Sequence, residues 1–341
     1  MLPLSEQAPE PPRMVDPAPG EEQKIEHTLR PKILAHFVGQ AHIKEPLIIS
    51  IAAAKKRNEP MEHVLLYGNP GLGKTTLAHI IAHEMDAGVT VTAGPALERV
   101  GDLAAIVSNL KRGDVLFIDE IHRLHKTIEE VLYAAMEDYA LDIVVGKGPS
   151  ARTLRMPLEP FTLIGATTKL NLLSNPLRDR FGHVYHLNFY EPQDIETIIR
   201  RNASLLNVMI DDAAAVLIAE RSRKTPRVAN RLLKRIRDYA DVRHDGHITE
   251  QITNDGLGML HIDKHGLDAV DRKILSTIIQ KFNGGPVGLN TLAAAVAEEM
   301  DTVETVYEPY LLQLGMIDRT PRGRVVTPRA HEHIKMMHSA V

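Results

Sequence analysis

Residues 68–75 of the chain read Gly-Asn-Pro-Gly-Leu-Gly-Lys-Thr, which fits the phosphate-binding pattern G-x-x-x-x-G-K-[ST]. The apolar residues at 64–67 predict a buried strand before this turn, and residues 77–81 predict a helix after it. Glycines in such a turn let successive backbone N–H groups face one anion, and the helix N-terminus adds its positive dipole end. We therefore expect a strand–loop–helix unit that binds a nucleoside triphosphate and belongs to an α/β sheet.

The pattern assigns a task to each polar residue of the turn. Lys74 is expected to reach the β- and γ-phosphates, and the Thr75 hydroxyl to bind Mg²⁺. Thr76 lies close enough in sequence to touch the α-phosphate, while Gly71 and Gly73 offer backbone N–H groups. The expected cofactors are thus ATP and Mg²⁺.

Strand-like and helical runs alternate on both sides of the turn. Strands are expected near 89–92, 115–118 and 161–166, with helical periodicity between them. This alternation predicts a mostly parallel sheet with helices on both faces, within a large domain at residues 26–190. Residues 141–156 interrupt the rhythm and read as an inserted β-hairpin. It is either a loop that happens to pair or a projecting contact arm.

Composition limits the class of protein. With 341 residues, two or three domains are expected. The chain has no Cys, which excludes disulfides and Cys-ligated zinc. No apolar run is long enough to span a membrane and no signal peptide is visible, so a cytoplasmic protein is expected. Six prolines in the first 22 residues predict a disordered tail at 1–25. The formal net charge of −4 means that any polyanion-binding surface must concentrate its positive charge locally.

Two smaller domains are expected after residue 190. Helical patterns at 193–206, 211–221 and 226–243 predict an all-α unit at 191–262. Pro226 suits the first position of a helix, which places Arg227 in its first turn. Residues 263–341 predict three helices and a two-stranded hairpin, the arrangement of a winged helix.

The charge pattern of the winged helix is uneven. Its third helix carries acidic residues and has no Lys or Arg between 302 and 314, so this face should repel phosphates. Arg319, Arg322 and Arg324 cluster on the wing instead. We expect the wing to hold duplex DNA by its backbone, independently of base sequence. The alternative is a solvated arginine-rich turn.

Two carboxylates follow the apolar strand at 115–118. Beside a phosphate-binding loop, Asp119 would lie at the carboxyl edge of the sheet and hold the Mg²⁺ shell. Glu120 would then orient and deprotonate the attacking water. The alternative is a strand that merely ends in polar residues.

The motifs resemble those of AAA+ ATPases, in the order typical of that family. The stretches that carry the resemblance after the phosphate loop lie at 119–122, 165–168, 176–181 and 225–227. Further stretches at 135–139, 284–288 and 319–324 are similar to the AAA+ motors that drive branch migration of Holliday junctions. The resemblance covers the chain from about residue 27 onward. The sequence departs from the family with Asn69 in place of the usual Pro, Lys169 in place of Arg, and Met300 where relatives often carry Arg.

The resemblance implies further residue roles. Thr168 would be a polar sensor beside the phosphate loop, and Arg227 would reach the γ-phosphate from the small helical domain. Arg180 would be an arginine finger that enters the site of a neighbouring subunit, with Arg178 as the alternative. The residues implied to border the adenine are Leu29, Arg30, Glu137, Asp138, Tyr139 and Tyr190.

The resemblance also implies an assembly, namely a hexameric ring around the duplex DNA arms of a Holliday junction. Ile143 and Val145 of the inserted hairpin would dock on a junction-binding partner protein. Two other functions stay open at this stage. One is a replication initiator that uses ATP as a switch, and the other is an ATP-gated adaptor that binds proteins and never moves DNA.

Overall fold

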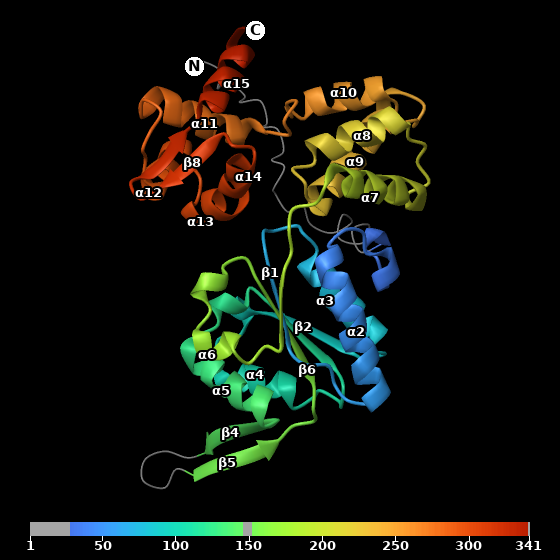
Figure 1. Ribbon diagram of the computed structural model, residues 1–341, viewed down its shortest axis with the longest axis vertical. Helices are drawn as coiled ribbons and strands as arrows, with labels where there is room; N and C mark the ends of the chain where they lie inside the picture. Colours follow the sequence, from blue (N-terminus) through green and yellow to red (C-terminus); the bar gives the residue numbers. More distant parts are fainter. Residues whose placement is uncertain (1–27, 146–151, 340–341) are drawn as a thin grey trace, which may run out of the picture. The chain divides into compact units, whose positions relative to one another are not determined.

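A computed structural model describes residues 28–145 and 152–339 of the chain (Figure 1). Residues 30–189 form one compact unit, and residues from 190 onward form a second, to which Leu29 also belongs. The whole of the expected N-terminal tail, residues 1–25, and the tip of the inserted hairpin lie outside the described residues.

The first unit contains a five-stranded sheet in the order β2-β3-β6-β1-β7 (Figure 1). Every neighbouring pair is parallel, as the alternation of strands and helices predicts. The strands are β1 (Val64–Tyr67), β2 (Val89–Ala93), β3 (Val115–Asp119), β6 (Thr162–Thr167) and β7 (His183–His186). The edge strand β7 has no counterpart in the sequence analysis, because its alternating half-buried and exposed residues give no apolar run.

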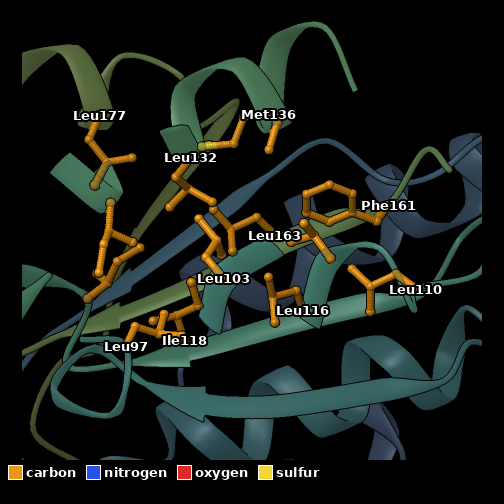
Figure 2. Close-up of a cluster of buried hydrophobic side chains, with 14 of the residues drawn as sticks. Leu97, Leu103, Leu110, Leu116, Ile118, Leu132, Met136, Phe161, Leu163 and Leu177 are labelled. Carbon is orange, nitrogen blue, oxygen red and sulfur yellow. The ribbon is translucent and has the colours of Figure 1, made fainter. Parts of the chain in front are cut away.

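Helices pack on both sides of this sheet (Figure 1). They are α2 (Ala41–Arg57), α3 (Lys74–Glu84), α4 (Val100–Val107), α5 (Lys126–Glu137) and α6 (Asn175–Arg178), with short 3₁₀ turns η1 (Leu34–His36), η2 (Gly94–Ala96), η3 (Ile121–Arg123) and η5 (Leu170–Leu172). Figure 2 shows α4 and α5 side chains, among them Leu103 and Leu132, meeting Leu116 and Ile118 of β3. Phe117 alternates to the opposite face, so β3 is buried on both sides.

The inserted hairpin forms, with β4 (Ala140–Val145) antiparallel to β5 (Arg152–Pro157). It projects from the sheet domain beside α5 (Figure 1). Its base is fixed by a hydrogen bond from Leu158 N to Tyr139 O at 2.7 Å and by an ion pair between Arg155 and Asp138 at 2.7 Å.

The second unit begins with a helical bundle. Its helices are α7 (Pro192–Leu205), α8 (Asp212–Arg221), α9 (Pro226–Arg243) and α10 (Glu250–Met259). The start of α9 at Pro226 is as predicted, with Arg227 in the first turn. The helix α10 is not in the sequence prediction, because two glycines, Gly256 and Gly258, weaken its helical pattern.

The winged helix completes this unit. It consists of α11 (Ala269–Lys281), α12 (Leu289–Val296), α13 (Met300–Thr302), the π-helical turn η6 (Val303–Tyr307), α14 (Glu308–Gln313), β8 (Ile317–Thr320), β9 (Gly323–Val326) and α15 (Pro328–Ser339). The three expected helices and the wing are present. The third helix is continuous through a π-helical turn, and α15 is an additional helix that packs on the same core through Ala330 and Ile334.

Candidate nucleotide site and DNA-binding wing

The phosphate-binding loop connects β1 to α3 in a conformation that requires its glycines. Gly68 has φ of 143°, and a Cβ there would lie 2.5 Å from Leu187 O. Gly71 and Gly73 also have positive φ angles, of 80° and 103°. Helix α3 then starts at Lys74, so its first N–H groups point into the loop. This is the strand–loop–helix geometry that the sequence predicts.

Lys74 is the buried cation of the loop. Its side chain is 8% exposed, and Nζ donates to Gly68 O at 2.7 Å and to Asn69 O at 2.9 Å. Burial lowers the pKa of Lys74 to about 8, while the charges of Asp119 and Glu120 oppose this change. The charges of Asp119 and Glu120 thus act on Lys74, so the phosphate loop and the two carboxylates after β3 belong to one site.

Asp119 and Glu120 form a rigid corner at the end of β3. Asp119 Oδ1 accepts a hydrogen bond from Glu120 N at 2.9 Å. Glu120 adopts φ of 47°, a left-handed conformation that costs free energy in a non-glycine residue. Gly94 permits this corner, because a Cβ at residue 94 would lie 2.5 Å from Glu120 O. The Glu120 carboxylate also pairs with Arg123 at 3.1 Å, and the sequence offered no signal for either Gly94 or Arg123.

Thr168 lies at the same edge of the sheet. Strand β6 pairs with β1 so that Thr167 is opposite Tyr67, which places Thr168 level with the first residue of the phosphate loop. Thr167 is buried, and its Oγ1 contacts His122 Nδ1 at 2.9 Å and accepts from Lys169 N at 2.9 Å. These contacts fix the backbone from which the half-buried Thr168 projects.

The expected adenine contact of Tyr139 stays a prediction, and within its own chain the ring lies away from the phosphate loop. The Tyr139 ring packs on His63, with ring centroids 6.4 Å apart, and on Phe161 at 6.0 Å. His63 and Phe161 precede β1 and β6, so all three rings lie at the amino edge of the sheet. The phosphate loop lies at the carboxyl edge, roughly 16 Å further along β1 at 3.3 Å per residue.

The neighbours of Tyr139 serve other contacts. Asp138 pairs with Arg155 at the base of the hairpin, and Glu137 pairs with Arg180 at 3.1 Å. These ion pairs do not test the adenine roles expected for Glu137 and Asp138, which stay predictions.

Arg180 is held firmly after the end of α6. Its Nη1 donates to Pro176 O at 2.7 Å, and its guanidinium carbon lies 4.5 Å from the centroid of the Tyr133 ring. With the ion pair to Glu137, these contacts hold both terminal nitrogens and one face of the guanidinium in a side chain that is 23% exposed. Tyr133 and Ser174 both bond to Glu129, which ties α6 to α5. Arg178, the alternative finger, is exposed at the last position of α6.

Three other predicted nucleotide residues belong to the helical unit. Leu29 is buried, and its carbonyl accepts from Arg201 Nη2 on α7 at 2.9 Å. Tyr190 is buried, and its N–H donates to Lys224 O at 3.0 Å. Arg227 is exposed in the first turn of α9. Arg30 is half-buried at the start of the sheet domain.

The wing differs from its predicted form at Arg324. This residue is 7% exposed, and its Nε and Nη2 both donate to Glu308 Oε2, at 3.0 and 2.7 Å. The Arg319 side chain is 58% exposed and lies 3.5 Å from Glu304 and 3.9 Å from Glu308. Arg322 is exposed at the turn of the wing. The exposed cations of the wing are therefore Arg319 and Arg322, while Arg324 is internal to the domain.

On the hairpin, Ile143 pairs in register with Leu154, whose side chain is 58% exposed on β5. Val145 pairs with Arg152 nearer the tip. The exposed Leu154 gives the hairpin an apolar contact surface, and the sequence analysis did not identify it.

The residues present fit a magnesium ion that is completed by phosphate oxygens. Mg²⁺ usually keeps several waters and takes one or two carboxylates together with substrate phosphates. A threonine hydroxyl at the loop and one carboxylate, Thr75 and Asp119, are such a donor set. Within the described part of the chain, no group of three or more His, Cys, Asp or Glu side chains forms a separate metal site. None of the described helices is both long and apolar enough to cross a membrane.

Comparisons with known proteins match most of the chain. A model of the Holliday junction DNA helicase RuvB P-loop domain matches residues 29–187, a RuvB AAA lid domain model matches 190–263, and a RuvB C-terminal winged helix domain model matches 264–335. The Holliday junction branch migration complex subunit RuvB of Dehalococcoides mccartyi is 58% identical over 316 residues, which are 93% of this chain and 90% of that protein.

Solved structures give the same result. A mutant of Thermotoga maritima RuvB matches with a TM-score of 0.84 and 53% identity, covering 90% of this chain and 98% of that chain. The Thermotoga maritima RuvB Holliday junction branch migration motor matches with a TM-score of 0.83 at the same identity and coverage.

Proposed function

The chain belongs to the RuvB family, and from this premise we propose that it is the ATP-hydrolysing subunit that drives branch migration of Holliday junctions in homologous recombination and DNA repair. The observation that carries the proposal is the convergence of Lys74, Asp119 and Glu120 at the carboxyl edge of a parallel sheet. Such a site binds and splits a nucleoside triphosphate, and the winged helix on the same chain offers a surface for DNA.

We assign the steps of hydrolysis as follows. Lys74 and the loop N–H groups bind the phosphates, with Gly71 and Gly73 allowing the close approach. When bound, Mg²⁺ neutralises charge on the phosphoryl oxygens, and Thr75 and Asp119 would hold it. Glu120 orients the attacking water and takes its proton. Thr76 contacts the α-phosphate, and Thr168 reports the state of the γ-phosphate.

We propose that residues from three further places complete this site. Leu29, Arg30 and Tyr190 border the adenine, and Arg227 reaches the γ-phosphate from the helical lid. Arg180 stabilises the transferring phosphoryl group in the site of a neighbouring subunit, since charge develops there in the transition state. Arg180 is favoured over Arg178 because Glu137, Tyr133 and Pro176 hold its guanidinium in place, and a pre-positioned cation loses less entropy on binding.

The proposed assembly follows from these roles. A finger that acts in a neighbouring site requires a head-to-tail contact between subunits, and the proposed assembly closes these contacts into a homohexamer around duplex DNA. Arg319 and Arg322 contact the DNA backbone without reading its sequence. The hairpin, through Ile143 and Val145, docks on RuvA, the junction-binding subunit, and RuvC joins in the resolving complex. The work takes place in the cytoplasm, where bacterial DNA lies.

The test is ATP-dependent dissolution of a synthetic four-way junction, with and without RuvA. Wild-type protein should dissolve the junction at a rate that RuvA increases. Glu120→Gln should bind ATP and DNA normally but lower ATP turnover by about 100-fold or more, because the water loses its general base. A wild-type protein that hydrolyses ATP on DNA but leaves the junction intact would contradict the motor and favour an ATP-gated adaptor.

A further inference from the structure

A buried arginine joins the helical lid to the winged helix. Arg223 lies in the short loop between α8 and α9, four residues before Arg227, and is 4% exposed. Arg223 and Lys224 both adopt left-handed backbone angles, with φ of 55° and 54°. Two consecutive non-glycine residues in this region are uncommon and persist only where surrounding contacts hold them.

The Arg223 guanidinium enters the core of the winged helix. Its Nη1 donates to Asp271 Oδ2 on α11 at 2.6 Å, and its Nη2 donates to Val306 O at 3.1 Å. The rings of Tyr307 and Tyr310 lie 5.6 and 4.8 Å from its central carbon. One side chain of the lid is thus fixed by α11 and by the third helix of the winged helix at the same time.

The acceptor Val306 lies in the π-helical turn η6, a conformation that is rare and often marks functional sites. Asp271 is fully buried, and burial raises its pKa to about 7, although the charge of Arg223 opposes the rise. A buried ion pair of this kind adds little stability over an apolar pair of the same size. Its value here is geometric, because it allows one orientation of the two domains within this unit.

The same loop touches the proposed nucleotide residues on its other side. Lys224 O accepts from the N–H of Tyr190, and Thr225 N–H donates to Ser222 O at 3.2 Å just before α9 begins. Tyr190 and Arg227 are therefore attached to a loop of a few residues whose anchor is Arg223. A shift of either residue would therefore be transmitted to this loop.

We infer that Arg223 is a positioning residue that couples ATP hydrolysis to movement of the DNA-binding domain. Its guanidinium transmits changes at Tyr190 and Arg227 to α11 and to the third helix of the winged helix. Arg223 itself touches neither nucleotide nor DNA. The inference rests on the proposed function, since it presumes that Arg227 senses the γ-phosphate.

The test measures how many base pairs of junction migrate for each ATP hydrolysed. Arg223→Met with Asp271→Leu removes both charges but keeps apolar volume, so that no orphan charge unfolds the domain. We expect base pairs per ATP to fall by about fivefold or more, the range of a typical coupling between sites. ATP turnover without DNA should stay near the wild-type value. The melting temperature should fall by a few degrees, because Asp271→Leu also removes the hydrogen-bond acceptor of Asp268 N at the start of α11. Arg223→Lys, which keeps the charge but loses the forked donor, should give an intermediate ratio.

Arg243→Ala is the matched control, because it removes an exposed arginine from the last turn of α9. It should leave the ratio unchanged. An unchanged ratio in the folded double variant would overturn the inference, as would an equal loss in Arg243→Ala. The wild-type protein distinguishes the two hypotheses. If the wild-type protein does not migrate the junction, the proposed function is wrong. If the wild-type protein migrates the junction and the double variant gives the same number of base pairs per ATP, the coupling role of Arg223 is wrong.

Discussion

Lys74 illustrates how a binding residue can oppose the stability of its own fold. The lysine is buried against carbonyl oxygens of the loop, which satisfy its hydrogen bonds but do not cancel the loss of hydration. Burial therefore lowers its pKa to about 8 from the usual value of 10.5. A base whose pKa is lowered on folding binds fewer protons in the native state, so folding gains stability as pH rises from about 8 toward 10.5.

This shift predicts the pH dependence of ATP use. Only the charged ammonium attracts the phosphates, and the apparent kcat/KM reports the ionisation of the free enzyme. We expect kcat/KM for ATP to fall as pH rises through about 8. Steady-state hydrolysis between pH 6.5 and 9.5 measures this. Lys74→Arg, which stays charged throughout, should remove the fall, and a flat wild-type profile to pH 9.5 would contradict the assignment.

Residues in linear motifs were predictable, whereas residues that support them were not. The phosphate loop and the strand-end carboxylates are defined by sequence spacing, so the placement of Lys74, Asp119 and Glu120 at one edge of the sheet could be predicted from the chain alone. The contact between Glu137 and Arg180 joins residues 43 apart and arises only when α6 packs on α5. No local pattern predicts such a contact.

At the scale of elements, the winged helix divides its arginines into two kinds. Arg324 lies beneath the wing in a buried pair with Glu308, and Arg319 lies on the surface above it. The sequence shows three arginines within six residues and cannot distinguish them. Arg319 and Arg324 are cross-strand partners on one face of the wing, so the position of Glu308 against that face decides which of them is buried. The fold itself was predictable from apolar periodicity, except where polar or glycine-rich elements, β7 and α10, carry no such signal.

The two arginines should therefore fail differently on substitution. Arg324→Ala leaves the 3% exposed Glu308 with only the exposed Arg319, at 3.9 Å, as a charged neighbour. Loss of its two short hydrogen bonds should lower the free energy of unfolding in urea by about 3 kcal/mol. Arg319→Ala should cost less than about 0.5 kcal/mol. It should instead weaken binding equally on unrelated DNA sequences and lower the salt slope by about one. If Arg324→Ala protein were as stable as wild type and lost more DNA affinity than Arg319→Ala, the structural role of Arg324 and the DNA-binding role of Arg319 would both be wrong.

The hairpin of β4 and β5 should be required for stimulation by RuvA but not for intrinsic ATP hydrolysis. Leu154→Asp changes an exposed residue, and Val145→Asp changes a predicted contact residue nearer the tip. Because both lie far from the phosphate loop in the fold, intrinsic ATP turnover should persist. Stimulation by RuvA should be lost, since a buried unpaired carboxylate in an apolar interface costs several kcal/mol. The measurement is ATP turnover titrated with RuvA, and persistent stimulation in both variants would show that the hairpin is not the docking arm.

At the scale of the whole molecule, the proposed site is incomplete in one chain. Arg180 is directed by contacts with α5 and α6 of its own domain, while Lys74 and Glu120 belong to the phosphate loop and β3. If a neighbouring subunit supplies Arg180, hydrolysis depends on assembly, and an isolated subunit hydrolyses ATP only slowly. Defects in the two parts should then complement each other when different chains share a ring.

Mixing two inactive chains tests this directly. Lys74→Ala lacks a working phosphate site but carries an intact finger, and Arg180→Ala has the opposite defect. In a random equal mixture, half of the sites come from Arg180→Ala chains and half of those receive a finger from a Lys74→Ala neighbour, so turnover should return to about a quarter of wild type. Arg178→Ala is the matched control, and it should be active without a partner. If the two inactive chains co-assemble, as size-exclusion chromatography would show, and turnover stays absent, then Arg180 does not act across subunits, because a shared site must be rebuilt in some of those rings.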